Sequence, residues 1–170
     1  AALLVVLGCW YRAAIVTFLV TFTWIELVDV TTYLNHYWFL TLAGVLLAVS
    51  PMAAACSVDA ARRPDAPAAT VPRGLVWLFR AQIAVVYVFA GAAKLNADWL
   101  LHALPLRLWL PARTDLTVVG PWLAHPQVAY AFSWGGALFD CTIVGFLLWR
   151  RTRLLAWIVV VVFHVATWIL

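Results

Sequence analysis

Five long apolar segments dominate the chain, and polar residues are concentrated between them. The segments lie at about residues 13–30, 37–49, 75–95, 128–149 and 154–170. A helix that crosses the hydrocarbon core of a bilayer needs about 20 predominantly apolar residues. The pattern therefore predicts an all-α, polytopic membrane protein: a bundle of about five membrane helices or helix pieces.

The N-terminal part of the pattern is less regular. Residues 1–8 resemble the tail of a further helix, and residues 11–12 are expected to form a short polar turn. Glu26 and Asp29 interrupt the first long segment near its end. The second segment is short for a span unless His36 and the residues before it lie within the membrane, so this polar cluster is predicted to be partly buried.

Two connecting segments differ in character. Residues 52–74 contain prolines and charges that break any span, and they are expected to form a loop. Residues 96–126 are too broken to cross a bilayer but are rich in leucine and tryptophan. Within them, residues 102–111 are predicted to form a short amphipathic element at the membrane interface.

The composition supports a membrane protein and excludes a soluble domain. The 170 residues are 66% hydrophobic and include 11 tryptophans, with a mean hydropathy of +0.99. A soluble domain of this size has too little interior to bury so much apolar surface. The chain begins and ends within apolar runs, so residues 1–170 are expected to be one domain, truncated at both ends.

The net charge of +4 is distributed between the apolar segments, which argues against a nucleic-acid surface and in favour of membrane topology. The basic residues fall on alternate turns, at Arg12, at Arg62, Arg63 and Arg73, and at Arg150, Arg151 and Arg153. These turns are predicted to be cytoplasmic. Three polar stretches then share the opposite side: residues 35–36, 94–98 and the connection to residue 126.

Lys94 ends the third apolar segment and has two interpretations. In one, its ammonium extends to the lipid head groups beside Trp99, which acts as an interfacial anchor. In the other, the small residues 90–93 allow helices to close around the amine, which loses solvent and becomes a base. An ordinary lysine pKa is about 10.4, and burial lowers it by roughly 3–5 units. Asp98 and Trp99 are expected to cap and anchor the turn that follows.

His36, Arg107 and His164 are candidates to share a pocket with Lys94. The positive charge of Arg107 would favour the neutral form of the Lys94 amine, and His36 would bind a substrate or shuttle a proton. Alternatively, His36 is a histidine at the start of a helix with its hydrogen bonds satisfied inside the protein. His164 would then make a purely structural hydrogen bond. Asp140, in the middle of a span, is expected to face the bundle and to make an internal helix pair, as is Glu26. The histidines are scattered, which gives no basis for a metal site.

Several ordered motifs resemble the vitamin K-dependent gamma-glutamyl carboxylases and their bacterial relatives, the horizontally transferred transmembrane (HTTM) domain proteins. The stretch from Tyr87 to Trp99 is similar to the family's Tyr-x-x-Ala-Gly-x-x-Lys-Leu-x-x-Asp-Trp signature. The other matching stretches are Asp29–His36, Pro105–Pro111, Gly136–Asp140 and Phe163–His164.

The resemblance implies a lyase-class enzyme that couples quinol epoxidation to carboxylation of glutamate in a peptide. Lys94 matches the base that deprotonates the quinol, and His36 matches a histidine that assists it. Asn35, Trp99, Arg107 and His164 are the candidates for substrate or quinol contact. The implied co-substrates are reduced vitamin K or another isoprenoid quinol, O2 and CO2.

The expected setting is the bacterial inner membrane, in contact with lipid and with the site on the non-cytoplasmic side. The main alternative is a non-catalytic scaffold or a lipid- or quinone-binding protein of the same fold. A transporter is a further alternative, but it requires polar residues along a path through both leaflets, whereas the pattern gathers them on one side.

Overall fold

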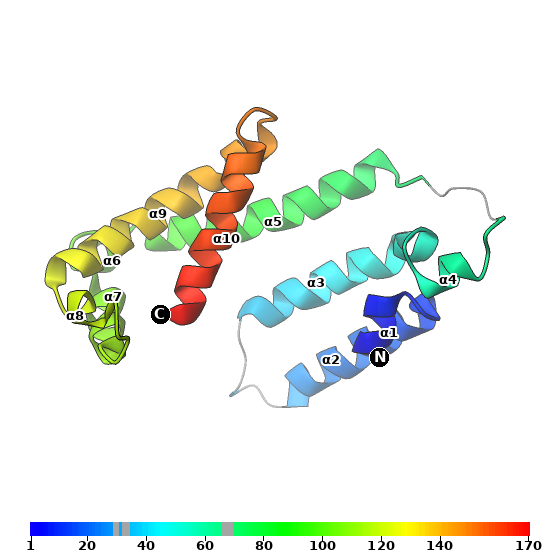
Figure 1. Ribbon diagram of the computed structural model, residues 1–170, viewed down its shortest axis with the longest axis horizontal. Coiled ribbons are helices and arrows are strands. Elements are labelled where there is room, and N and C mark those ends of the chain that lie inside the picture. The colour runs from blue at the N-terminus through cyan, green and yellow to red at the C-terminus, as the bar shows by residue number, and fades with distance from the viewer. Residues whose placement is uncertain (29–30, 32–34, 66–69) are drawn as a thin grey trace. The chain divides into compact units, whose positions relative to one another are not determined.

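The computed structural model describes residues 1–28, 31, 35–65 and 70–170 (Figure 1). The protein is 79% helical, with no strand among these described residues. It divides into two compact units, Ala1–Ile83 and Ala84–Leu170. The predicted all-α fold is confirmed, whereas Asp29 lies outside the described residues.

The described residues of the first unit form long helices, short helices and a 3-10 turn. They are α1 (Ala2–Leu7), α2 (Tyr11–Val28), α3 (Asn35–Val49), the 3-10 turn η2 (Met52–Ala54), α4 (Val58–Ala61) and the first part of α5 (Arg73–Lys94). Where the structure describes it, the loop expected at residues 52–74 therefore holds two helical turns and the first residues of α5. In α4, the hydroxyl of Ser57 accepts the backbone N–H of Ala60 at 3.0 Å and caps the helix.

The polar turn predicted at residues 11–12 is wrong, because α2 already begins at Tyr11. The chain reverses just before, at Gly8, whose φ of 61° ends α1 in the left-handed region that glycine adopts without strain. The carboxylate of Asp59 then accepts the backbone N–H groups of Trp10 and Tyr11 at 3.0 and 2.9 Å. A distant side chain thus caps α2.

Helices α2 and α3 pack against each other through a few specific contacts. The hydroxyl of Tyr11 donates to the carbonyl oxygen of Leu47 at 3.0 Å. The hydroxyl of Thr41 donates to Oε2 of Glu26 at 3.3 Å. The internal helix pair expected of Glu26 is therefore confirmed, with a threonine as the partner.

The second unit contains the end of α5 and the C-terminal helices. They are α6 (Ala97–Leu100), α7 (Leu104–Trp109), the 3-10 turn η3 (Leu110–Arg113), α8 (Gly120–Leu123), α9 (Pro126–Leu148) and α10 (Arg153–Ile169). Helices α9 and α10 pack against each other, and the short helices pack against the beginning of α9. Four buried residues, Ala103, Leu110, Leu123 and Ala129, form the core of this packing.

The short element predicted at residues 102–111 is present and is helical, as α7 followed by η3. Its two faces differ: Leu110 is 3% exposed, whereas Leu108 and Trp109 are 67% and 63% exposed. One face of the element is therefore part of a packed core, while the element also exposes large apolar side chains; its amphipathic character stays a prediction. Its place at a membrane interface stays a prediction.

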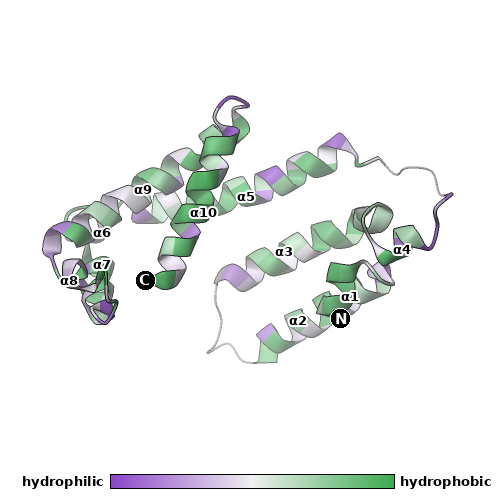
Figure 2. Ribbon diagram, viewed as in Figure 1, coloured by the Kyte–Doolittle hydropathy of each residue, from purple (hydrophilic) through white to green (hydrophobic). Residues whose placement is uncertain are grey.

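Among the described residues, three helices, α2, α5 and α9, are long and apolar enough to cross a membrane. Two shorter apolar helices, at His36–Val49 and Arg153–Ile169, accompany them. Figure 2 shows hydrophobic residues along these helices and hydrophilic ones at connections such as that between α9 and α10. Many large apolar side chains face outward, among them Trp168 at 84% and Phe89 at 71% exposure, as expected of helices that contact lipid. The chain is a membrane protein.

Candidate active site at Lys94

Lys94, the last residue of α5, makes an ion pair with Asp140 of α9. Its Nζ lies 2.6 Å from Oδ2 of Asp140 and also donates to the carbonyl oxygen of Ala90 at 3.3 Å. The Asp140 side chain is 6% exposed and that of Lys94 is 20% exposed. The ammonium is thus held between two helices rather than extended along the surface. The prediction that Asp140 faces the bundle is confirmed.

Gly91, one turn before Lys94, allows α5 to approach α9 closely. A Cβ atom at this position would lie 2.9 Å from Sγ of Cys141 and 3.2 Å from its backbone nitrogen. Atoms this close would force the helices apart, so only glycine fits without a shift. Small residues at a crossing permit close helix contact in membranes. The close approach brings Lys94 within hydrogen-bond distance of Asp140.

The turn after Lys94 is capped by Asn96 and not, as expected, by Asp98. The side-chain carbonyl of Asn96 accepts the backbone N–H of Trp99 at 2.9 Å, and its amide donates to the carbonyl oxygen of Ala93 at 2.7 Å. Asn96 therefore caps the N-terminus of α6 and also satisfies a terminal carbonyl of α5. One side chain fixes the direction in which the chain leaves Lys94.

Trp99 anchors this turn to α9, as predicted. Its indole Nε1 donates to the carbonyl oxygen of Ser133 at 2.8 Å, and the Ser133 hydroxyl donates back to the carbonyl oxygen of Trp99. Ser133 is fully buried. The Nζ of Lys94 lies 5.0 Å from the centroid of the Trp99 ring, within the range of a cation–π contact. The ammonium therefore has a carboxylate and an aromatic face as neighbours.

A second cluster, of aromatic residues, lies on the same face of α5. Tyr87, seven residues before Lys94, is 9% exposed. Its hydroxyl lies 3.4 Å from Nε2 of His164 on α10. The Tyr87 ring packs edge-on against Phe139 at 5.7 Å, and Phe139 stacks on Phe163 at 3.9 Å. His164 thus belongs to the unit that contains Lys94, with Tyr87 as its contact.

The remaining candidates are not joined to this site by described contacts. Arg107 is an exposed residue of α7, and its side chain has no hydrogen bond or ion pair in the part of the chain that the structure describes. Asn35 and His36 begin α3 in the first unit. The pocket shared by Lys94, His36, Arg107 and His164 stays a prediction.

Besides Asn96, the contributors Tyr87 and Ser133 were not anticipated. Tyr87 opens the motif that contains Lys94, and a spacing of seven residues places both on one helix face. That spacing was the available signal. No sequence pattern pointed to Ser133, because its hydroxyl and its carbonyl oxygen bond only to Trp99, which is distant in the sequence.

Apolar membrane helices that enclose a lysine–aspartate pair define an α-helical integral membrane protein with a charged site between its helices. The model of the HTTM domain family matches residues 1–170, the whole chain. The chain therefore belongs to the HTTM domain family, whose domain is associated with vitamin K-dependent carboxylase-like proteins. No solved structure matches the chain.

Proposed function

We propose that the protein is a quinol-dependent, carboxylase-like membrane enzyme in which Lys94 is the base. The observation that carries this proposal is the position of its amine, 2.6 Å from Asp140 and 5.0 Å from the Trp99 ring, at a close helix crossing. Ionisable residues that face the interior of a membrane bundle mark functional sites by default. The family membership supports the same reaction class.

The residues around Lys94 fit a reduced isoprenoid quinol. A quinol ring needs flat apolar walls and a partner for its hydroxyl groups; Trp99 and Tyr87 offer aromatic faces, and the Lys94–Asp140 pair offers a polar partner. The outward apolar surface of α5 and α10 suits an isoprenoid chain in the bilayer. With O2, the bound quinol supplies the strong base needed to remove a proton from a peptide glutamate, and CO2 is the group added.

Lys94 can accept a proton only after Nζ has released one. Oδ2 of Asp140 is the nearest acceptor, at 2.6 Å. Transfer of that proton converts the ion pair into a neutral pair, so no isolated charge is left in apolar surroundings, where it would be costly. Asp140 is thus the positioning residue that holds the amine and takes its proton. By resemblance to the family, His36 is assigned to assist Lys94, and Asn35 and Arg107 are assigned to quinol or substrate contact, on the non-cytoplasmic side of a bacterial inner membrane.

The second candidate function is a non-catalytic scaffold or a lipid- or quinone-binding protein. The observation that favours it is the same ion pair, because both charges are already satisfied and can serve simply to clamp α5 to α9. The two functions differ in what they require of residue 94. A clamp needs a cation, whereas a base must lose its proton, which a guanidinium does not do at ordinary pH.

The test is quinol epoxidation by the full-length protein in nanodiscs, with and without a glutamate peptide and bicarbonate. Lys94→Arg is expected to lower the epoxidation rate by about 10²-fold or more, as loss of a general base does. Peptide carboxylation that depends on Lys94 would identify the complete reaction. Wild-type epoxidation in Lys94→Arg, or none in the wild type with several quinols, would favour the scaffold.

A stability measurement separates lost chemistry from lost structure. Lys94→Met leaves the Asp140 carboxylate buried without its cation, which costs about 3–5 kcal/mol. In the double variant Lys94→Met/Asp140→Asn both charges are gone, so we expect thermal stability to return close to that of the wild type. Epoxidation should stay absent in this double variant. Its recovery together with stability would show that Lys94 is not the base.

A further inference from the structure

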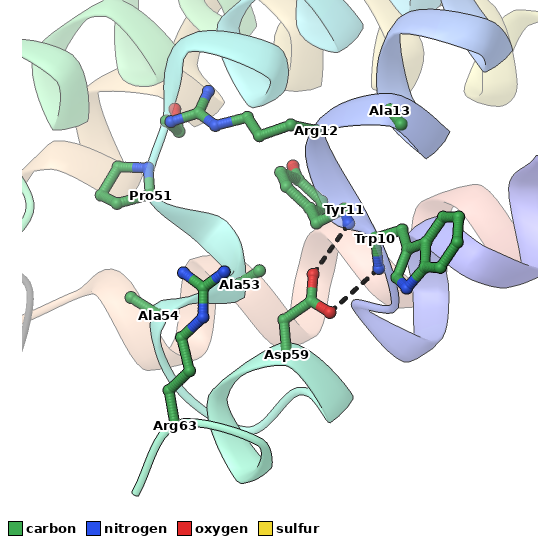
Figure 3. A pocket seen from close by; sticks show the side chains of 10 residues that line it. Trp10, Tyr11, Arg12, Ala13, Pro51, Ala53, Ala54, Asp59 and Arg63 are labelled. Carbon is green, nitrogen blue, oxygen red and sulfur yellow. Dashed lines mark hydrogen bonds between the residues drawn. The ribbon is translucent and has the colours of Figure 1, made fainter. Parts of the chain in front are cut away.

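A cavity of about 540 Å³ lies in the first unit, where the start of α2 meets the end of α3 and α4 (Figure 3). Small-molecule sites in proteins have volumes of about 300–1,000 Å³. The cavity is lined by Trp10, Tyr11, Arg12, Ala13, Ser50, Pro51, Ala53, Ala54, Asp59 and Arg63. It belongs to the other unit from Lys94 and shares no residue with that site.

Two guanidinium groups and one carboxylate line this cavity. Both oxygens of Asp59 already accept backbone N–H groups, from Trp10 and Tyr11. Arg12 donates one N–H to the carbonyl oxygen of Ala48, which leaves other donors of its five. In Figure 3 the side chain of Arg63, which follows α4, extends toward Pro51 and Ala53, along the wall of the cavity. The donors that remain include those of Arg12 and Arg63, which are cationic.

We propose that this cavity binds a phosphate group, presented by an anionic phospholipid or as free phosphate. Guanidinium groups match phosphate oxygens in both charge and geometry. Exposed apolar residues next to the cavity place it where a lipid head group is available: Trp10 is 71% exposed, and Val6 on α1 is 81% exposed. Tryptophan is enriched at the membrane–water interface, and anionic lipids attract nearby basic residues.

Arg63→Gln tests the site, with Arg73→Gln as the matched control. Both residues are exposed and both changes remove one positive charge, but only Arg63 lines the cavity. The full-length protein in detergent is titrated with phosphatidylglycerol, with an uncharged glycolipid of the same acyl chains and with inorganic phosphate, and the bound species are counted by native mass spectrometry.

We expect Arg63→Gln to bind phosphatidylglycerol about fivefold more weakly than the wild type, since one arginine near the membrane surface contributes about this factor. Arg73→Gln should bind like the wild type. If the same loss occurs with inorganic phosphate, free phosphate is also a ligand; if inorganic phosphate does not bind, the lipid is the source.

The proposal fails if Arg63→Gln binds both phosphate compounds as the wild type does, or if the glycolipid binds as tightly as phosphatidylglycerol. It also fails if Arg73→Gln weakens binding equally, because the effect is then one of net charge. Arg12→Lys gives a second check that keeps the charge but loses the planar fork. Weaker binding by this variant supports arginine-specific recognition, and unchanged binding contradicts it.

Discussion

Asp59 fixes the start of a membrane helix from 48 residues away in the sequence. The N–H group of Tyr11, followed by that of Trp10, lowers the pKa of the Asp59 carboxyl below its ordinary value. The nearby Arg62 and Arg63 act in the same direction, and partial burial opposes them. Because the ionised form is favoured by folding, this contact makes the stability of the first unit depend on pH.

The predicted pH dependence has a definite sign. The folded pKa of Asp59 lies below the unfolded value of about 3.9, so its contribution is complete above about pH 4 and is lost as the pH falls through the folded pKa. We expect the difference in melting temperature between wild type and Asp59→Asn to be largest near pH 6 and to shrink below about pH 4. Asp65→Asn, at an exposed aspartate, is the control and should give no such trend. A difference that stays constant with pH would contradict the assignment.

The sequence singles out the charged members of the Lys94 site but not their contacts. A carboxylate in the middle of an apolar run is costly when it faces lipid, so Asp140 had to face the bundle. Its partner was not predictable, because 46 residues separate it from Lys94 and no local pattern connects them. Trp99 was expected as an anchor, but its bond to Ser133 depends on how α6 folds back.

At the scale of whole elements, Gly91 determines how closely α5 approaches α9. We expect Gly91→Val to lower the melting temperature clearly, because the added atoms meet Cys141 and push the helices apart. Gly135→Val is the matched control, since no atom lies within 4 Å of a Cβ at Gly135. The measurement is thermal unfolding of both purified variants in the same detergent, with epoxidation as a second readout.

Equal destabilisation by the two valines would mean that helix propensity, and not the crossing, accounts for the loss. A Gly91→Val variant as stable as the wild type would show that Cys141 moves aside without cost. The Lys94–Asp140 pair should weaken along with the crossing, so epoxidation is expected to fall further in Gly91→Val than in Gly135→Val.

The long helices were predicted closely, whereas among the short elements only those at residues 1–8 and 102–111 were anticipated. Apolar run length is a local signal, so α9 was anticipated to within a few residues of its observed bounds, Pro126–Leu148. The packing of Ala103, Leu110 and Leu123 has no such signal, because these residues come from three separate turns that meet only when the chain folds back. The start of α2 was misplaced for the same reason, since its cap comes from Asp59.

For the whole molecule, the distribution of arginines predicts which connections share a side of the membrane. Cys56, an exposed free cysteine just before α4, reports on the expected cytoplasmic side. We expect a membrane-impermeant maleimide to label it in inside-out vesicles but not in intact cells. Thr117→Cys, introduced between η3 and α8 after the three native cysteines are replaced by serine, should give the opposite result.

Cys56→Ser is the control for labelling at that position and should remove the signal from inside-out vesicles. Labelling of both positions from the same side would overturn the predicted orientation. It would also remove the argument that residues 94–98 and the connection to residue 126 lie on the non-cytoplasmic side. The Lys94–Asp140 pair itself would be unaffected, because it rests on contacts within one unit.

The aromatic stack of Phe139 and Phe163 attaches α10 to α9 without any described ion pair between these helices. Buried neighbours, Ile143 and Ala156, complete the contact. Ionic strength has little effect on the stability of such an interface, since counter-ions screen charges and not dispersion contacts. At the start of α2, by contrast, the exposed pair of Asp59 and Arg62, 3.7 Å apart, is open to screening. Salt is therefore expected to weaken the pair of Asp59 and Arg62, and likewise the exposed pair of Arg113 and Asp115, while the packing between α9 and α10 is kept.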